Sequence, residues 1–468
     1  MSKIFICESS EISGGRFDPL YLLYGSQAFL KNTSFSIKTL GSVIQSIKTG
    51  FAAGKNDQSD FTKGIIQIRP TNLDENGILK FEKNIYIPRD VSSEHLITKG
   101  EVLFNNTNSQ ELVGKTAYFD LEGDFVSSNH ITRIKTDINQ LLPQYLSILL
   151  NIYQKNKVFF NTCVNWNNQS GINVDFLKSY QIPIPPIPTQ EKIINIMDNA
   201  YKIKKQKEQE AKEILDSIDS YLLGELGIKL PKQENEQNCT FIKKFSEISG
   251  NRFDPNYHKI YYAKLESALA QGKYKLVRLG EIITFLASGS TPEAKGEDYE
   301  QNGKYHFLRL VNFNANLDID LENSLFVKEH IYKNLLSRVQ LQQNDILFGI
   351  AGSIGKVAQY KSNKFAVVNQ AIAILRFNTN VANDFMLYLL ASCLTQIQVT
   401  RLQRPIAQPN LNTAELKSIY IPLPPLEIQN QIAYKITKRK EKAKTLQQEA
   451  KEILESAKKE VESMILGG

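Results

Sequence analysis

Residues that build metal centres, disulfide frameworks and nucleophile sites are scarce in this chain. Its 468 residues include only 4 cysteines, 5 histidines and 1 tryptophan. The cysteines are far apart and form no C-x-x-C pair, which argues against a zinc site and favours free thiols in a reducing compartment. The histidines are scattered, and none recurs in the other half of the chain. We therefore expect no metal site.

Long apolar runs are also absent. After Ile4–Cys7 the N-terminus turns polar, so no signal peptide is visible. The longest apolar stretch, near Gln144–Tyr153, is about half the length needed to span a membrane. We expect a cytoplasmic protein with no membrane partner.

The common catalytic motifs are missing as well. The nearest match to a phosphate-binding loop is Gly114-Lys115-Thr116, but Ser109 occupies the position of the first glycine. Its repeat, Gly355-Lys356-Val357, has Ile350 at that position. No dinucleotide fingerprint, G-x-S-x-G elbow or N-P-P-[YF] tetrapeptide is present. We expect no catalytic residue and no cofactor in this chain.

Composition places the chain among ordinary soluble proteins. It is 42% hydrophobic and 22% charged, and its length corresponds to roughly three domains. The net charge of +7 and the pI of about 8.9 are compatible with a polyanionic partner, although many soluble enzymes share them.

What the chain does contain is a repeat of itself. The motif S-E-I-S-G-x-R-F-D-P begins at Ser10 and again at Ser246, 236 residues later. Leu177-Lys178-Ser179, which precedes I-P-I-P-P, returns 239 residues later as Leu416-Lys417-Ser418 before I-P-L-P-P. This period indicates a tandem duplication of a whole domain with its helix. A duplicated chain fits a bipartite partner, and duplex DNA with two half-sites is the leading candidate.

Each half has the same order of parts. The entry motif is followed by about 150 residues of short β-type runs broken by turn residues, which predicts an α+β domain with a largely antiparallel sheet. The proline motif then closes the domain because proline cannot donate to a strand ladder, and a long helix follows. The predicted division is 1–185 first domain, 186–228 central helix, 229–240 linker, 241–424 second domain and 425–468 C-terminal helix.

The two long helical segments carry heptad-spaced apolar and small residues, which predicts that they pair as a coiled coil. The alternative is two unrelated amphipathic surface helices. Lys204 and Lys207 weaken the seam and are expected to fix its register. The predicted seam residues are Met197, Ala211, Ile214, Ile218, Ile436, Ala443, Leu446, Ala450, Ile453 and Ala457.

Candidate DNA contacts come from matched turns and from polar loops before each proline motif. Asn and Gln side chains suit adenine, Arg suits guanine, and a lysine beside a turn glycine suits a phosphate. The alternative is ordinary turn chemistry. Trp166 is expected in the core. The matched-turn candidates are Arg69, Lys115, Asn129, His130, Arg309, Lys356, Asn369 and Gln370, and the loop candidates are Asn165, Asn167, Gln169, Arg401, Arg404 and Gln408.

The whole arrangement resembles the specificity (S) subunits of type I restriction–modification systems. The markers are the two I-P-[IL]-P-P motifs, the glutamines Gln190 and Gln429 that follow them, and L-G-x-[IV] at Leu40 and Leu279. The resemblance implies two target-recognition domains separated by two long helices that form an antiparallel coiled coil, with pseudo-two-fold symmetry. No base-contacting residue can be carried over, because these domains diverge widely within the family.

The resemblance also implies partners. A specificity subunit has no catalytic activity, and each recognition domain reads one half of a split, asymmetric DNA sequence. Two methyltransferase subunits methylate adenine at N6 with S-adenosylmethionine, and translocating restriction subunits use ATP. Two alternatives stay open: a DNA-targeting subunit of a fused restriction–methylation enzyme, and a coiled-coil adaptor that never touches DNA. An independent enzyme comes third.

Overall fold

The chain forms two compact units, each containing the globular part of one repeat. Unit 1 comprises Met1–Lys207 with Gln448–Gly468, and unit 2 comprises Glu208–Gln447. The computed structural model describes residues 29–166, 169–232, 242, 244, 252–293, 298–404 and 410–467. The first copy of the entry motif, at 10–19, lies outside the described residues.

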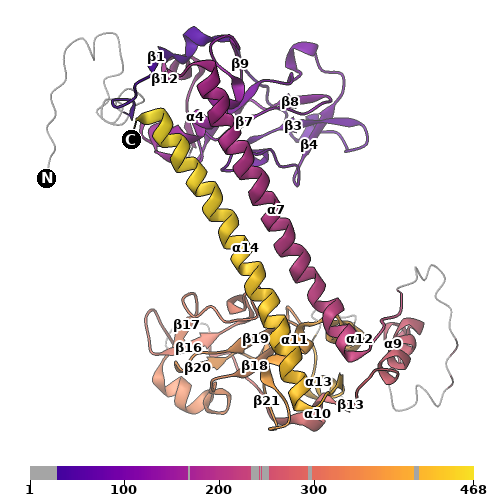
Figure 1. The fold of residues 1–468 in the computed structure, drawn as a ribbon. Helices are drawn as coiled ribbons and strands as arrows, with labels where there is room; N and C mark the ends of the chain where they lie inside the picture. The colour runs from indigo at the N-terminus through magenta and orange to yellow at the C-terminus, as the bar shows by residue number, and fades with distance from the viewer. Residues whose placement is uncertain are drawn as a thin grey trace. The chain divides into compact units, whose positions relative to one another are not determined.

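Unit 1 is built on three small sheets and a two-stranded ribbon (Figure 1). The antiparallel sheet β2-β9-β5-β7 consists of Ile44–Thr49, Ile131–Thr136, Val102–Asn105 and Thr116–Tyr118. The sheet β4-β3-β8 consists of Ile85–Pro88, Gly64–Ile68 and Phe125–Ser127, and its β3–β8 pair is parallel. The sheet β10-β11-β6 consists of Val164–Trp166, Gln169–Gly171 and Thr107–Asn108. The ribbon pairs β1 (Ser36–Thr39) with β12 (Gln181–Ile184).

Unit 2 repeats the antiparallel sheet, the mixed sheet with one added strand, β15, and the ribbon. The antiparallel sheet β14-β21-β18-β19 consists of Ile283–Ser288, Ile372–Phe377, Asp345–Gly349 and Val357–Tyr360. The sheet β15-β17-β16-β20 consists of Tyr299–Glu300, Leu325–Val327, Tyr305–Leu308 and Ala366–Val368, with β16–β20 parallel. The ribbon pairs β13 (Leu276–Arg278) with β22 (Tyr420–Pro422). Equivalent strands therefore have equivalent partners, which confirms the duplicated α+β architecture.

Helices complete each unit. Unit 1 has α4 (Pro143–Lys155), α5 (Val158–Thr162), α6 (Val174–Ser179) and the 3-10 turns η1 to η4 (Leu40–Val43, Lys55–Asp57, Pro70–Asn72, Ser93–His95). Unit 2 has α9 (Ile260–Ala270), α10 (Leu279–Ile282), α11 (Asn383–Ala391), α12 (Cys393–Leu402), α13 (Thr413–Lys417) and the short turns η5 to η8 (Pro255–His258, Leu310–Asn312, Ile331–Leu335, Ser337–Val339).

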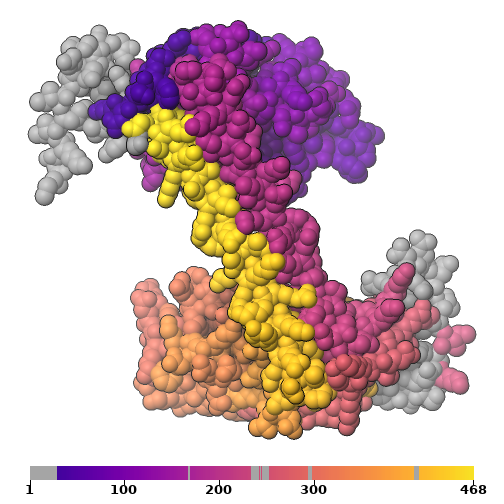
Figure 2. All heavy atoms as spheres, viewed as in Figure 1, coloured from indigo at the N-terminus to yellow at the C-terminus, as the bar shows by residue number. Residues whose placement is uncertain are grey.

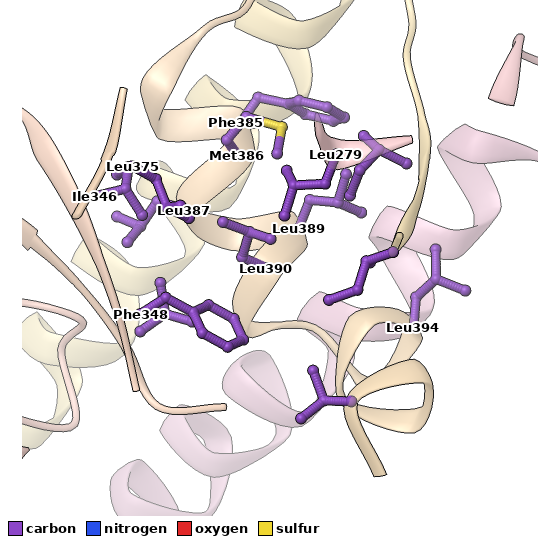
Figure 3. Close-up of a cluster of buried hydrophobic side chains, with 14 of the residues drawn as sticks. Leu279, Ile346, Phe348, Leu375, Phe385, Met386, Leu387, Leu389, Leu390 and Leu394 are labelled. Atoms are coloured by element: carbon purple, nitrogen blue, oxygen red, sulfur yellow. The ribbon is translucent and has the colours of Figure 1, made fainter. Parts of the chain in front are cut away.

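The main core of each unit lies between its antiparallel sheet and its helices. In unit 2, leucines of α11 pack against Phe348 of β18 and Leu375 of β21 (Figure 3). In unit 1, α4 packs in the same way on β5 and β7, with Leu146 and Leu149 fully buried. Among the described residues no single helix is long and apolar enough to cross a membrane, although the bent pair α11–α12 meets that test by length and composition.

The long helices α7 (Ile187–Leu226) and α14 (Leu426–Leu466) run antiparallel. In unit 2, Glu225 pairs with Lys435 at 3.9 Å and Glu210 with Lys442 at 3.0 Å, so position rises along one helix as it falls along the other. In unit 1, Lys207 pairs with Glu449, as expected for a lysine that fixes register. The outer sides of both helices are exposed to solvent (Figure 2).

The seam is largely the predicted one. Met197, Ala211, Ile436, Ala443, Leu446, Ala450 and Ala457 are buried, whereas Ile214, Ile218 and Ile453 are only half-buried. In unit 1, α14 also buries Leu454, Val461 and Ile465, which the heptad count missed. They differ from the strict heptad because α14 there also packs on the globular part of unit 1.

The proline motifs act together with the glutamine that follows them. Gln190 is fully buried: its amide NH2 donates to the carbonyls of Gln140 and Pro185, and its oxygen accepts from the Leu142 N–H. Gln429 makes the same three bonds, to Asn380, Pro424 and Ala382. Each glutamine thus fastens the start of a long helix to its own domain.

Candidate nucleic-acid interface

A polar groove of about 920 Å³ crosses unit 1 and contains five of the predicted site residues. They are Arg69, Lys115, Asn129, His130 and Gln169, which come from the ends of β3, β7 and β8 and from β11. The remaining groove residues are Ala52, Ala53, Gly54, Gln67, Pro70, Thr71, Lys83, Asn84, Ile85, Thr107, Asn108, Ser109, Leu112 and Ser128.

The charge of this groove has one sign. Arg69, Lys83 and Lys115 line it, and no described carboxylate does. A second cavity of unit 1, of about 590 Å³, is lined instead by five carboxylates and two lysines. The carboxylates are Glu75, Asp120, Asp198, Glu455 and Glu462, and burial and Asp120 raise the pKa of Asp198. A polyanion therefore fits the polar groove and is repelled by the second cavity.

Arg69 is held in place by a buried amide. Gln67 is fully buried, and its NH2 donates to the Phe51 carbonyl, which orients its oxygen toward Arg69. Arg69 donates to that oxygen from Nε at 3.0 Å and from Nη2 at 2.8 Å, and to the Ala53 carbonyl. Its Nη1 has no hydrogen bond within the described parts of the chain. A guanidinium fixed on one edge and free on the other is suited to a base or phosphate.

Lys115 is in different surroundings from those expected of a phosphate contact. Its ammonium donates to the carbonyls of Leu73, at 2.7 Å, and Pro70, at 3.4 Å. Burial lowers the pKa of Lys115. These bonds hold the 3-10 turn that follows Arg69, so the contact with phosphate stays a prediction. Lys83 is exposed in the same groove. Matching the two repeats did not identify it, because the equivalent position in the second repeat is Asn323.

The turn that carries Asn129 and His130 is positioned by backbone contacts. Buried Asn106 donates to the Asn129 carbonyl and accepts from Thr107, while its N–H donates to the His130 carbonyl. Gly50 packs on this segment so closely that a Cβ would lie 2.1 Å from the Ser127 carbonyl. Gly289 meets the Val368 carbonyl in the same way, which explains why both repeats have a glycine here, in Thr49-Gly50 and Ser288-Gly289.

The hairpin β10–β11 lies beside the groove. Gln169 faces the groove, whereas Asn165 accepts a hydrogen bond from Ser170 at 2.6 Å. Asn167 lies outside the described residues. The expectation that Trp166 is a core residue is wrong, since its side chain is 46% exposed. It is exposed because its strand, β10, is an outer strand whose three residues are all exposed.

Unit 2 holds the equivalent side chains in altered surroundings. Arg309 has a buried Nε without a hydrogen bond to any described residue, because Phe307 occupies the position equivalent to Gln67, which supports Arg69. Lys356 is exposed, and its ammonium has no hydrogen bond among the described residues. Asn369 caps its own turn by accepting from Ala371, and Gln370 is exposed.

The loop candidates of unit 2 are tied to the R-F-D-P motif. Arg252 pairs with Asp254 at 2.7 Å and donates to carbonyls at the C-terminal end of α12. Arg401 donates to the Tyr257 carbonyl and pairs with Glu266, and Arg404 pairs with Glu415. Contact of either loop arginine with guanine therefore stays a prediction and requires these bonds to break. Gln408 lies outside the described residues.

Within the described parts of the chain, no group of three His, Cys, Asp or Glu residues could hold a metal ion. The site is thus made of cationic, amide and hydroxyl side chains around a groove. Such side chains bind and discriminate, and none of them is arranged as a nucleophile with its base.

Both repeats match one known protein family. The model of the type I restriction modification DNA specificity domain matches twice, over residues 32–213 and 271–455. The chain belongs to this family. The two matches cover the two repeats, and each unit accordingly contains one recognition domain. The family implies DNA and a restriction–modification complex as partners.

Individual relatives agree with this. The chain is 23% identical over 439 residues to a putative type I restriction enzyme MjaX specificity subunit of Methanocaldococcus jannaschii, covering 93% of each chain. It is 26% identical over 100 residues, 21% of each chain, to the EcoBI specificity subunit of Escherichia coli. These relatives are named specificity subunits, the non-catalytic component of the type I system, so the expectation that this chain is no enzyme is confirmed.

A solved structure shares the fold. One from a study of complex assembly and conformational transition of the type I R-M system has a TM-score of 0.57 at 15% identity, covering 92% of this chain and 96% of that one. The HsdS subunit of Thermoanaerobacter tengcongensis has a TM-score of 0.45 at 16% identity, covering 92% and 97%.

Proposed function

We propose that this specificity subunit reads a split, asymmetric DNA sequence, with the polar groove of unit 1 on one half-site and the equivalent face of unit 2 on the other. The observation that supports this is the polar groove itself, in which predicted contact residues from separate segments meet without a carboxylate. Gln67 accepts a hydrogen bond from the Nε of Arg69, whereas the Nε of Arg309 has no partner among the described residues. Because the two guanidinium groups are held differently, the two halves would read different bases.

The proposal includes partners that this chain does not contain. Two methyltransferase subunits would dock on it and methylate adenine at N6 with their own S-adenosylmethionine. Restriction subunits would supply ATP-dependent translocation and cleavage. The chain itself would bind neither cofactor and would act in the cytoplasm. A fused restriction–methylation enzyme is the second candidate for the partner.

The test begins with methylome sequencing of cells that express this chain with its methyltransferase, which identifies the site. Arg69→Ala should then relax recognition in one half-site and Gln370→Ala in the other, each by about 1–3 kcal/mol at the affected base. Lys83→Ala should weaken binding to all sequences. It should also reduce the salt slope, which is the slope of the logarithm of the DNA-binding constant against the logarithm of salt concentration, by about one.

The matched control is Lys155→Ala, which removes a lysine from the carboxylate-lined cavity of the same unit. It should leave the recognised sequence and the salt slope of DNA binding unchanged. The proposal fails if Arg69→Ala and Gln370→Ala change neither half-site, or if Lys155→Ala changes the salt slope as Lys83→Ala does.

A further inference from the structure

Trp166 is the single tryptophan of the chain, and it lies on the surface beside the polar groove. It belongs to β10, whose residues Val164 and Trp166 are 50% and 46% exposed and share one face of the strand. Its partner across the hairpin is Gln169, which faces the polar groove. An indole and an amide thus stand side by side on one ribbon.

The indole is held against the ribbon. A Cβ on Gly171 would lie 2.4 Å from the tip of the Trp166 ring, so the ring rests where any other residue would place a side chain. The base of the hairpin is anchored by buried Ser170 and Ile172, and the Ile172 N–H donates to the Asn106 carbonyl. A ring supported on one side and open on the other loses little freedom on binding a partner.

The surroundings of the ring favour DNA. Trp166 lines a hollow of about 420 Å³ together with Thr49, Asn106, Thr107, Thr132, Val164, Gly171, Ile172, Asn173 and Val174. No described carboxylate lines it, and Thr107 belongs to both this hollow and the polar groove. The hairpin therefore lies between two hollows, and neither is lined by a described carboxylate that would repel a polyanion.

Resting on the proposed function, we propose that the β10–β11 ribbon enters the major groove of the half-site read by unit 1, where Trp166 packs on a thymine methyl group. A two-stranded ribbon fits the width of the major groove, and the thymine methyl is the apolar group that base pairs display there. Gln169 beside it bonds adenine, so the pair of side chains recognises A·T pairs. Unit 2 has no tryptophan, so this contact is confined to one half-site.

The experiment uses the single tryptophan as its probe. This chain is labelled with 5-fluorotryptophan and assembled with unlabelled methyltransferase, which gives one fluorine resonance. Duplex carrying the methylated site should shift that resonance, and duplex with the unit 1 half-site scrambled should not. Replacing the contacted thymine by uracil removes one methyl group from an apolar contact and should weaken binding about fourfold.

Variants of this chain distinguish loss of the contact made by the indole from loss of the fold. Trp166→Ala should weaken cognate binding about tenfold and abolish the difference between thymine and uracil duplexes. Gly171→Ala keeps the indole but pushes it aside, and should reduce that difference. Phe61→Ala removes a 75% exposed aromatic side chain that lines neither hollow and should change nothing.

The outcomes distinguish this inference from the proposed function. An unshifted fluorine resonance on cognate DNA, or a thymine preference that persists in Trp166→Ala, overturns the contact while sequence-specific binding still supports the function. Failure of the assembled wild-type complex to prefer any sequence overturns both.

Discussion

At the scale of single residues, the repeats place equivalent side chains in unlike surroundings. Lys115 and Lys356 both follow a glycine with positive φ, at +92° for Gly114 and +85° for Gly355. Yet Lys115 bonds two carbonyls of its own unit, whereas Lys356 is exposed. The same motif therefore has a structural task in unit 1 and places an exposed cation on the surface of unit 2.

This difference predicts opposite effects for the matched alanine variants. Lys356→Ala should reduce the salt slope of DNA binding by about one and leave stability unchanged, because only a phosphate contact is lost. Lys115→Ala should lower the free energy of unfolding by about 1–3 kcal/mol, because two carbonyls lose their donor. Salt titrations of the assembled methyltransferase and urea unfolding of the chain measure both. Reversed effects would contradict the assignment.

His306 predicts an acid dependence of the stability of unit 2. Ser324 donates to the Leu321 carbonyl, so its hydroxyl oxygen accepts from the His306 Nδ1–H. Burial and Lys364 lower the pKa of His306 below its ordinary value of about 6.5. The stability it contributes is therefore complete above that pH and declines below it, by at most about 1.4 kcal/mol per pH unit.

The matched variant is His306→Ile, because repeat 1 has Ile66 at the equivalent position of β3. It should reduce the acid limb, which is the decline in the free energy of unfolding between pH 7.5 and pH 5. Replacing exposed His330 by Gln should leave the limb in place. An unchanged acid limb in His306→Ile would exclude His306 as its source.

At the scale of elements, the junction between each domain and its long helix depends on one glutamine. Prolines of the motif stand within the strands β12 and β22, on two-stranded ribbons where a missing N–H is tolerated. The helix then begins within a few residues, and the buried glutamine in its first turns satisfies three backbone groups of the domain.

Gln429→Glu should destabilise the chain increasingly as pH rises. An ionised carboxylate cannot donate to the Asn380 and Pro424 carbonyls, so the folded state raises the pKa of the new carboxyl. Its neutral form is favoured, so stability is present below the unfolded pKa of about 4.3 and is lost as pH rises through the folded pKa. We expect a loss on the order of 3 kcal/mol at pH 8.

Urea unfolding at pH 5 and pH 8 measures this loss. The control is Gln431→Glu, an exposed position on the same helix, which should have little effect. A loss equal at both pH values would show that ionisation is not its cause.

At the scale of the whole molecule, the two units do not coincide with the two repeats: unit 1 joins Met1–Lys207 to Gln448–Gly468, and unit 2 is Glu208–Gln447. The core of unit 1 includes Leu454, Ala457, Val461 and Ile465, which lie at the C-terminal end of the sequence. The core of unit 2 likewise includes Leu222 and Leu226 of α7. Each unit is therefore completed by the helix that belongs to the other repeat.

A chain truncated after Gln447 should consequently lose the stability of unit 1, although unit 1 contains the N-terminal repeat. Leu454, Val461 and Ile465 are removed, each worth about 1.5–3 kcal/mol when fully buried, together with the smaller buried residues Ala450 and Ala457. Limited proteolysis with mass spectrometry should find new cleavages within 36–184 and none within 276–404. Truncation after Leu466 is the control and should protect both ranges. Persistent protection of 36–184 in the shorter chain would contradict this.

The sequence by itself determined the duplication, the order of parts, the two long helices and most of their seam. These follow from local rules of periodicity, turn chemistry and proline placement, which act over a few residues. It also identified the family through motifs such as the proline run and its glutamine.

Only the tertiary structure decided which candidates share a groove. Arg69, Lys115 and Gln169 meet because distant strands end at one place, and long-range pairing cannot be seen in spacing. It also exposed Trp166, which composition placed in the core, and engaged Lys115 with its own backbone. The physical reason is that exposure and hydrogen bonding depend on neighbours brought together by folding, not on neighbours in the chain.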